Sequence, residues 1–214
     1  MTDRPGAGVQ ETIDFDGLAI SFDGRVLRPR PWTVAQSRWA ALLLDGLPPG
    51  PVLELCAGAG QIGLAAVARS PRRLLCVDAN PDATAFAAAN AKAAGMADQV
   101  EVRTARLTDA LSEDEGFALV IADPPWVRRA ETGRFPEDPL AAIDGGDDGL
   151  EVARDCVAVI GAHLLPRGAA LLQLGSADQV AALGSAMSAA GLRASAVRTC
   201  HGGVVARLDP LEPR

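Results

Sequence analysis

Aromatic side chains are scarce in this chain of 214 residues: tyrosine is absent, and Phe and Trp together make up 4% of the residues. The three tryptophans, Trp32, Trp39 and Trp126, are therefore worth locating individually. The hydrophobic fraction of 49% comes mostly from Ala, Val and Leu. A core of sufficient size can form from these residues without metals or disulfides. The length favours one α/β domain with a short N-terminal extension.

Positive charge is also in short supply. Lys and Arg number 20 against 27 Asp and Glu, which gives a formal net charge of −7. Proteins that grip nucleic acid through its phosphates usually carry a basic stripe. The arginines of this chain are instead scattered in ones and twos. The charge therefore disfavours avid, non-specific binding of DNA or RNA, although a local basic rim is still possible.

The sequence has no paired cysteine motif and only two histidines. Three of the four cysteines stand in apolar runs, which is typical of small buried hydrophobic residues in a reducing compartment. We therefore expect neither a metal site nor a disulfide framework. The N-terminus lacks the features of a signal peptide, and the longest apolar runs have only the length of a strand. These absences predict a soluble, cytoplasmic protein without membrane spans. The cysteines are Cys56, Cys76, Cys156 and Cys200.

Three segments follow from the turn and helix signals. Residues 1–11 are polar and contain Gly and Pro, which predicts a disordered tail. Residues 12–47 contain two alternating runs split by Asp16-Gly17, indicating a β-hairpin, and then a lead-in helix with Thr33 as its N-cap. Residues 48–214 form the main domain.

In the main domain, strand patterns alternate with helix patterns, which indicates a mostly parallel sheet covered by helices. Two final runs around His201-Gly202-Gly203 indicate an antiparallel hairpin. The predicted fold class is α/β: a Rossmann-like, doubly wound, mostly parallel seven-stranded sheet with an antiparallel last strand, preceded by an N-terminal β-hairpin. The expected strands are 51–57, 73–79, 100–105, 117–123 and 168–175, and the expected helices are 61–69, 81–95, 150–165 and 178–190.

A glycine-rich turn follows the first strand of this domain. The run from Gly58 to Gly63 matches GxGxxG, and Asp78 lies 20 residues after Gly58 at the end of the next strand. Glycines let the backbone turn sharply and approach a ligand, and the acid can accept hydrogen bonds from ribose hydroxyls. Nicotinamide dinucleotides and S-adenosylmethionine both need such a site. A purely structural turn is the remaining alternative.

Glu54 favours the methyl donor over a dinucleotide. It stands in an otherwise apolar strand, two residues before Cys56, where an unpartnered carboxylate is costly to bury. The adjoining loop can use this acid to tether a cationic amino-acid moiety. A dinucleotide places its pyrophosphate at the helix N-terminus, and an acid in the approaching strand opposes that charge.

The segment Asp123-Pro124-Pro125-Trp126 closes the fourth strand, where a parallel sheet exposes its ligand site. Two prolines fix the backbone and present carbonyls without competing N–H donors. Asp123 and the Pro124 carbonyl can accept both hydrogens of an NH₂ group, and Trp126 can stack on a planar amide or base. Holding the nitrogen in line with a methyl donor supplies much of the catalysis. The alternative is a rigid turn with a core Trp.

Together these motifs resemble the release-factor glutamine methyltransferases, Rossmann-like enzymes dependent on S-adenosylmethionine. The resemblance covers roughly residues 24–191. It rests on RVLRPRPWT, VLELCAGAGQIG, CVDANPDA, FALVIADPPW, DPLAAIDGGDDGLEVARDCV and GAALLQLGSADQVAAL. It implies acceptor-site roles for Asp123, Pro124, Pro125 and Trp126. It also implies a donor site made of Glu54, Cys56, Ala57, Gly58, Gly60, Asp78, Ala79, Arg106 and Leu107.

The sequence departs from that family at several positions. Asp123 and Trp126 replace the family's Asn and Tyr, and Ala105-Arg106 replaces its Gly-Asp pair. We also expect its helical N-terminal domain to be missing. Four functions therefore stay open: methylation of a protein glutamine amide, methylation of a base or small-molecule amine, donor binding without catalysis, and a nicotinamide-dependent oxidoreductase resting on GxGxxG alone. We expect a protein substrate for the first. The acidic residues from Asp144 to Asp148 are expected to cap the following helix, with Asp147 or Asp148 as its N-cap, rather than to bind metal.

Overall fold

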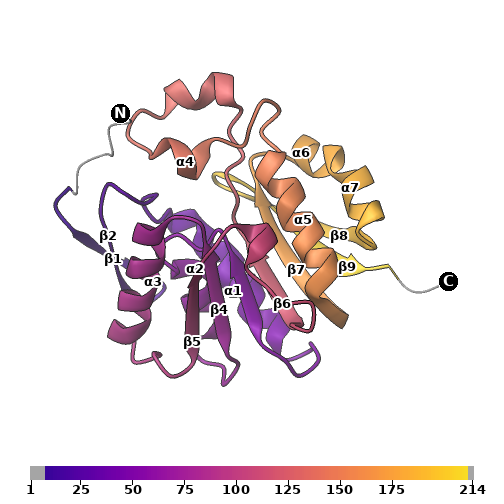
Figure 1. Ribbon diagram of the computed structural model, residues 1–214, viewed down its shortest axis with the longest axis horizontal. Coiled ribbons are helices and arrows are strands. Elements are labelled where there is room, and N and C mark those ends of the chain that lie inside the picture. Colours follow the sequence, from indigo (N-terminus) through magenta and orange to yellow (C-terminus); the bar gives the residue numbers. More distant parts are fainter. Residues whose placement is uncertain (1–7, 212–214) are drawn as a thin grey trace.

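Two β-sheets organise the chain in the computed structural model, which describes residues 8–211 (Figure 1). The smaller sheet is an antiparallel hairpin of β1 (Glu11–Phe15) and β2 (Leu18–Phe22). It turns at Asp16-Gly17, both of which have positive φ, as the sequence predicted. Residues 1–7 of the tail predicted for residues 1–11 lie outside the described residues. Residues 8–10 have no regular structure, and Glu11 already begins β1.

The larger sheet has seven strands in the order β5-β4-β3-β6-β7-β9-β8. The first five are parallel, and β9 runs antiparallel to both of its neighbours. This arrangement confirms the predicted fold class. The strands are β3 (Val52–Leu55), β4 (Leu74–Asp78), β5 (Val100–Thr104), β6 (Phe117–Ala122), β7 (Leu164–Leu174), β8 (Leu192–Cys200) and β9 (Gly203–Pro210).

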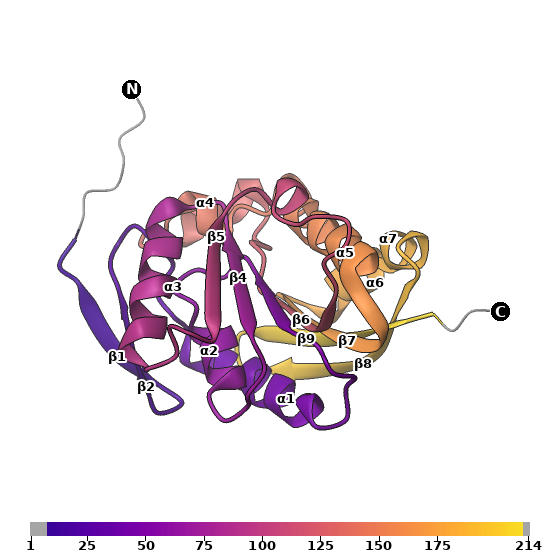
Figure 2. The same ribbon diagram turned by 60° about the horizontal axis from the view of Figure 1, so that its bottom comes forward.

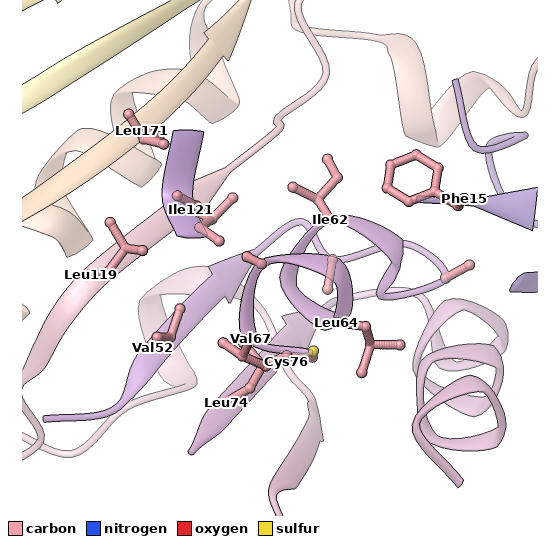
Figure 3. Close-up of a cluster of buried hydrophobic side chains, with 14 of the residues drawn as sticks. Phe15, Val52, Ile62, Leu64, Val67, Leu74, Cys76, Leu119, Ile121 and Leu171 are labelled. Carbon is pink, nitrogen blue, oxygen red and sulfur yellow. The ribbon is translucent and has the colours of Figure 1, made fainter. Parts of the chain in front are cut away.

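Helices cover both faces of this sheet, as Figure 2 shows for α1 and α5. One apolar cluster joins side chains of α1, α2 and α3 to Val52, Leu119 and Leu171 (Figure 3). A second cluster joins α5, α6 and α7 to alternate residues of the same strands. Because both faces are buried, β3 and β6 are continuous apolar runs apart from Glu54. The helices are α1 (Val34–Leu44), α2 (Gln61–Val67), α3 (Pro81–Ala93), α5 (Glu151–His163), α6 (Ala177–Ala182) and α7 (Gly184–Ala189).

Several element boundaries differ from the sequence prediction. Thr33 is the N-cap residue of α1, as predicted, but its hydroxyl donates to the Arg30 carbonyl and makes no side-chain cap, because a 3-10 turn (η1, Pro31–Thr33) precedes the helix. Helix α5 ends at His163 and β7 begins at the next residue. Pro166 explains this, since the residue before a proline is disfavoured in the helical region. The predicted helix at 178–190 is divided into α6 and α7 at Leu183, beside the weak helix former Gly184.

The predicted loop between β6 and α5 contains two short helical turns, η3 (Arg129–Arg134) and α4 (Leu140–Ile143). We call residues 127–150 the insertion. It is anchored to the N-terminal segment by Arg30, whose guanidinium donates to both carboxylate oxygens of Asp138 at 2.7 and 2.5 Å. The insertion therefore lies beyond the carboxyl end of the sheet, next to the segment that contains Arg30 (Figure 1). Within residues 8–211, no helix is long and apolar enough to cross a membrane.

Candidate active site

The predicted site residues gather at the carboxyl ends of the central strands. Leu55 is in register with Val77 on one side and with Ala122 on the other. The next residue of each strand or loop is Cys56, Asp78 or Asp123 respectively. These three residues thus lie at one edge of the sheet, which is where open α/β sheets bind ligands.

The glycine-rich turn after β3 has a left-handed backbone at Cys56 (φ 55°), Gly58 (φ 54°) and Gly60 (φ 78°). A side chain at Gly60 is disfavoured twice, because a Cβ there would also lie 3.1 Å from the Ala87 Cβ of α3. Gly58 differs, since a Cβ built on it would meet no atom within 4 Å. The turn therefore packs tightly on α3 at Gly60 and leaves open space at Gly58.

Asp78 links the glycine-rich turn to the turn between β4 and α3. Its Oδ2 accepts a hydrogen bond from the Gly58 N–H at 2.8 Å, and its Oδ1 accepts from the Asn80 N–H at 2.8 Å. Burial raises the pKa of Asp78, against backbone hydrogen bonds from Asn80, Gly58 and Ala79, which lower it. Each carboxylate oxygen has a further lone pair, so Asp78 can still accept hydrogen bonds from a ligand. Its neighbour Ala79 is exposed.

Glu54 lies beneath the turn, where only 2% of its surface is exposed. Its Oε1 accepts from the Gly63 N–H in α2 at 2.9 Å, and its Oε2 accepts from the Cys76 thiol at 3.3 Å. Burial raises the pKa of Glu54 to about 7, and the charges of Asp123 and Asp78 act in the same direction. Both oxygens are therefore engaged by the protein itself, and the side chain supports the turn from below.

Asp123 follows β6 directly and is partly accessible to solvent. No group within residues 8–211 donates a hydrogen bond to its carboxylate, although its surroundings are largely protein. Burial raises the pKa of Asp123 to about 7. The site thus contains three neighbouring carboxyls, of which only Asp123 has no hydrogen-bond donor among the described residues. The carboxylate of Asp123 can therefore accept hydrogen bonds from a bound molecule, and a cation beside it would stabilise its ionised form.

Trp126 is half-buried, and its ring packs on the backbone of Gly175, just after β7. A Cβ on Gly175 would lie 2.6 Å from Cε3 of the ring, so a larger residue there would displace the tryptophan. Between Asp123 and Trp126, Pro124 is buried and Pro125 is half-buried. The structure therefore brings the whole predicted Asp-Pro-Pro-Trp segment (residues 123–126) to the ligand edge of the sheet.

Arg106 and Leu107 reach the same edge from the outer strand β5. The Ala105 N–H donates to the Asp78 carbonyl at 3.0 Å, which brings this loop alongside the end of β4. Arg106 is exposed, and Leu107 packs against the second apolar cluster. Both predicted residues therefore flank Asp78, on the side away from Asp123.

The structure also tests the predicted roles of residues outside the main site. Trp39 is a core residue, as predicted, with 5% of its surface exposed. The expected cap of α5 is wrong in detail: Leu150 is the N-cap residue and makes no side-chain cap. Asp148 accepts instead from the Leu150 N–H at 3.0 Å, one residue before the helix. Trp32 contacts Gly202 in the β8–β9 turn.

Two glutamines that sequence reasoning missed contact the backbone of this site. Gln36 of α1 donates to the Ala122 carbonyl, and Gln179 of α6 donates to the Trp126 carbonyl. For Gln36 a signal existed: it shares a helix face with the apolar Trp39 and Ala40, at spacings of three and four. For Gln179 there was none, because an isolated glutamine in a short helix is usually solvated.

The chain is similar in sequence to two curated glutamine methyltransferases. A release factor glutamine methyltransferase of Deinococcus radiodurans is 33% identical over 167 residues, covering 76% of this chain and 59% of the relative. A ribosomal protein uL3 glutamine methyltransferase of Bordetella pertussis is 31% identical over 189 residues, covering 82% of this chain and 61% of the relative. The chain thus spans about 60% of the length of these curated relatives. They confirm the family resemblance found in the motifs.

A solved RNA methyltransferase from Salinibacter ruber, in complex with S-adenosyl-L-homocysteine, has a similar fold. The TM-score is 0.58 at 18% identity, with 88% of this chain and 97% of that chain covered. The family model described as conserved hypothetical protein 95 matches residues 17–133, more than half of the chain. The chain therefore has a methyltransferase fold and belongs to the conserved hypothetical protein 95 family.

Proposed function

We propose that this chain is an S-adenosylmethionine-dependent N-methyltransferase whose acceptor is a planar amide nitrogen, the side chain of a glutamine in a protein. The observation that carries the proposal is the Asp123 carboxylate. It lies at the ligand edge without a hydrogen-bond donor from residues 8–211, next to a rigid proline step and near the acidic residues Asp78 and Glu54. The proposal includes a cytoplasmic location, because the relatives are named for a release factor and a ribosomal protein.

The residues of the predicted donor site fit this cofactor. When bound, S-adenosylmethionine supplies a methyl group on a positively charged sulfur. The open space at Gly58 leaves room for a ligand, and three neighbouring carboxyls favour a cation over an anionic dinucleotide. In this proposal Cys56, Ala57, Gly58 and Gly60 surround the methionine part, and Glu54 holds their turn in shape. Asp78 accepts hydrogen bonds from the ribose hydroxyls, and the adenine is surrounded by Ala79, Arg106 and Leu107.

The acceptor site uses the Asp-Pro-Pro-Trp segment. An amide nitrogen is a poor nucleophile because its lone pair is delocalised into the carbonyl. Asp123 and the Pro124 carbonyl accept its two hydrogens and draw lone-pair density out of the amide plane. Pro125 keeps the backbone rigid, and Trp126 stacks on the flat amide. Orientation of this kind is a large source of catalysis. No general base is needed before attack, because the N–H proton becomes acidic only as the N–C bond forms and the methyl–sulfur bond breaks; it would then be lost, to Asp123 or to solvent, and a neutral thioether would be left.

A second candidate acceptor is an exocyclic base amine. The Asp123–Trp126 pair favours it, and the similar fold of an RNA methyltransferase is compatible with it. The acidic composition and the protein-directed names of the sequence relatives favour the glutamine. Transfer of radiolabelled methyl in a cell extract, followed by protease or nuclease digestion, separates the two: label that becomes small only after nuclease treatment refutes the protein acceptor.

The mechanism is tested with Asp123→Ala. We expect methyl transfer to be abolished while the affinity for S-adenosylhomocysteine, measured by calorimetry, stays within a few-fold of the unmodified protein. Turnover that persists in this variant refutes the role of Asp123. Binding of NAD(H) without binding of S-adenosylhomocysteine refutes the proposed donor.

A further inference from the structure

The first end of the Asp-Pro-Pro-Trp segment is held by a buried amide. Gln36 has no exposed surface. Its Nε2 donates to the Ala122 carbonyl at 3.1 Å and to the Leu171 carbonyl at 3.0 Å. Ala122 immediately precedes Asp123, and Leu171 belongs to the neighbouring strand β7. One side chain therefore joins β6 to β7 directly below the proposed catalytic carboxylate.

The second end of the segment is held in the same way by Gln179. Its Nε2 donates to the Trp126 carbonyl at 2.9 Å, and its Oε1 accepts from the Gly175 N–H at 2.9 Å. Gly175 is also the residue on which the Trp126 ring packs. This amide therefore fixes the backbone of Trp126 relative to the surface that supports its ring.

The two glutamines reach the segment from opposite faces of the sheet. Gln36 comes from α1, which packs in the first apolar cluster, and Gln179 comes from α6, which packs in the second. Pro124 and Pro125 have no N–H, so these two residues cannot donate ladder hydrogen bonds to β7. The side-chain amides of Gln36 and Gln179 donate hydrogen bonds to the backbone at the two ends of the segment instead.

Burial of Gln36 has a cost that packing alone does not explain. Its Oε1 atom is buried and has no partner within residues 8–211. An unsatisfied acceptor of this kind normally destabilises a protein, and such groups require a specific explanation. Here the explanation is that the donor half of the same amide binds two backbone carbonyls at the ligand edge.

We propose that Gln36 and Gln179 are positioning residues that clamp the Asp-Pro-Pro-Trp segment to β7, and thereby set the separation of the Asp123 carboxylate and the Trp126 ring. The proposal rests on the function proposed above for those two residues. Neither glutamine touches the substrate; each acts through the backbone that it binds.

The test uses nuclear magnetic resonance of the ¹⁵N-labelled protein. The three tryptophans give three indole N–H signals, and Trp126→Phe assigns one of them. In Gln179→Ala we expect the Trp126 indole signal to shift and broaden while the Trp32 and Trp39 signals stay in place. The Gly175 amide should exchange with solvent about tenfold faster, because its acceptor is lost.

Gln99→Ala is the matched control. Like Gln36, Gln99 donates to two backbone carbonyls through one amide, those of Ser70 at 2.8 Å and Arg72 at 2.7 Å. It differs from both clamp residues in its place, because it precedes β5 at the amino end of the sheet. This variant should lower thermal stability by a similar amount without moving the Trp126 signal. An unchanged Trp126 signal in Gln179→Ala, or an equal change in the control, overturns the proposal.

Kinetics distinguish positioning from general stability. With a glutamine-containing peptide as acceptor, Gln179→Ala should raise the KM for the peptide about tenfold and change the Kd for S-adenosylhomocysteine less than about twofold. Gln36→Met is the second variant, read out by the shift of the Asp123 backbone amide. Because the spectroscopic readouts need no turnover, absence of methyl transfer would refute the proposed function without deciding whether the clamp exists.

Discussion

At the scale of single residues, the site is defined by carboxyls in an environment that disfavours their charge. Asp123 illustrates this most clearly, because burial raises its pKa to about 7 and no described protein group offers a compensating hydrogen bond. An ionised acid in such a place is unfavourable until a cation or a hydrogen-bond donor arrives. Donor and acceptor binding would both relieve this cost, which links occupancy of the site to the protonation of one residue.

The first prediction concerns pH. Ionised Asp123 accepts hydrogen bonds from both N–H groups more strongly than the protonated acid, so kcat/KM for the acceptor should fall as the pH decreases through about 7. In Asp123→Asn this acidic limb should disappear, since an amide oxygen does not titrate. Measurement of kcat/KM between about pH 5.5 and 8.5 checks this. An acidic limb of equal position in the variant would assign it to another group, such as Glu54.

The same substitution should affect stability in a direction that depends on pH. The folded protein retains the Asp123 proton up to about pH 7, whereas the unfolded chain loses it near the ordinary value of 3.8. Stability contributed by this group therefore falls as the pH rises between these values. Above that window Asp123→Asn should be more stable than the unmodified protein, by on the order of 2 kcal/mol. Thermal unfolding at two pH values, with Asp14→Asn in the exposed hairpin as control, measures the difference.

Much of the site could be predicted residue by residue, because its chemistry is local in sequence. The glycines need their backbone conformations, Asp78 ends a strand beside them, and the two prolines precede an aromatic residue. The partners of these groups could not be predicted in the same way. Glu54 is an example: its oxygens accept hydrogen bonds from Gly63 of α2 and Cys76 of β4, partners that depend on tertiary packing. Its predicted role toward the methyl donor stays a prediction.

At the scale of elements, the insertion between β6 and α5 is fixed by a contact across the chain. Arg30 and Asp138 are 108 residues apart, and the Asp138 side chain is only 5% exposed. The sequence showed both halves, a Pro-Arg-Pro run and an acid-Pro pair, without showing that they meet. Strand and helix identities were predictable from periodicity, whereas such long-range pairs depend on tertiary packing. The boundary of α5 was mispredicted for a simpler reason, since Pro166 acts one residue ahead of its own position.

Arg30→Ala should loosen the insertion. Loss of a partner leaves the nearly buried Asp138 carboxylate uncompensated, so we expect a loss of ~1–3 kcal/mol in unfolding free energy and faster proteolysis within residues 127–150. Arg38→Ala is the control, because the Arg38 side chain in its pair with Asp16 is 68% exposed. That exposed pair should contribute less than about 1 kcal/mol. Equal effects of the two variants, measured by denaturant unfolding, would show that the Arg30 pair has no special anchoring role.

At the scale of the whole molecule, the acidic surface bears on the choice of acceptor. The formal charge of −7 opposes the phosphate backbone of a nucleic acid. Many arginines are also engaged in ion pairs with acidic neighbours, as Arg129 is with Asp144 and Asp147. Within residues 8–211, these ion pairs reduce the positive charge that the surface offers to a polyanion.

We accordingly expect weak binding to a generic single-stranded RNA. Fluorescence anisotropy with a labelled oligonucleotide should show no saturation below about 10 µM protein at low salt, where electrostatic binding is strongest. Addition of S-adenosylhomocysteine should not change this result. Tight binding that weakens steeply with salt would contradict the expectation and favour the base-amine acceptor.

The predicted division of the chain at residue 48 remains a prediction, but the Gln36 contacts give it a practical consequence. Residues before that point supply a structural bond to the ends of β6 and β7. A protein shortened to residues 48–214 would keep the glycine-rich turn and lose the Gln36 hydrogen bonds to β6 and β7. We expect such a truncated form to be less stable, because it also loses the core residues of α1, and to lose the arrangement of Asp123 and Trp126 before it loses affinity for S-adenosylhomocysteine.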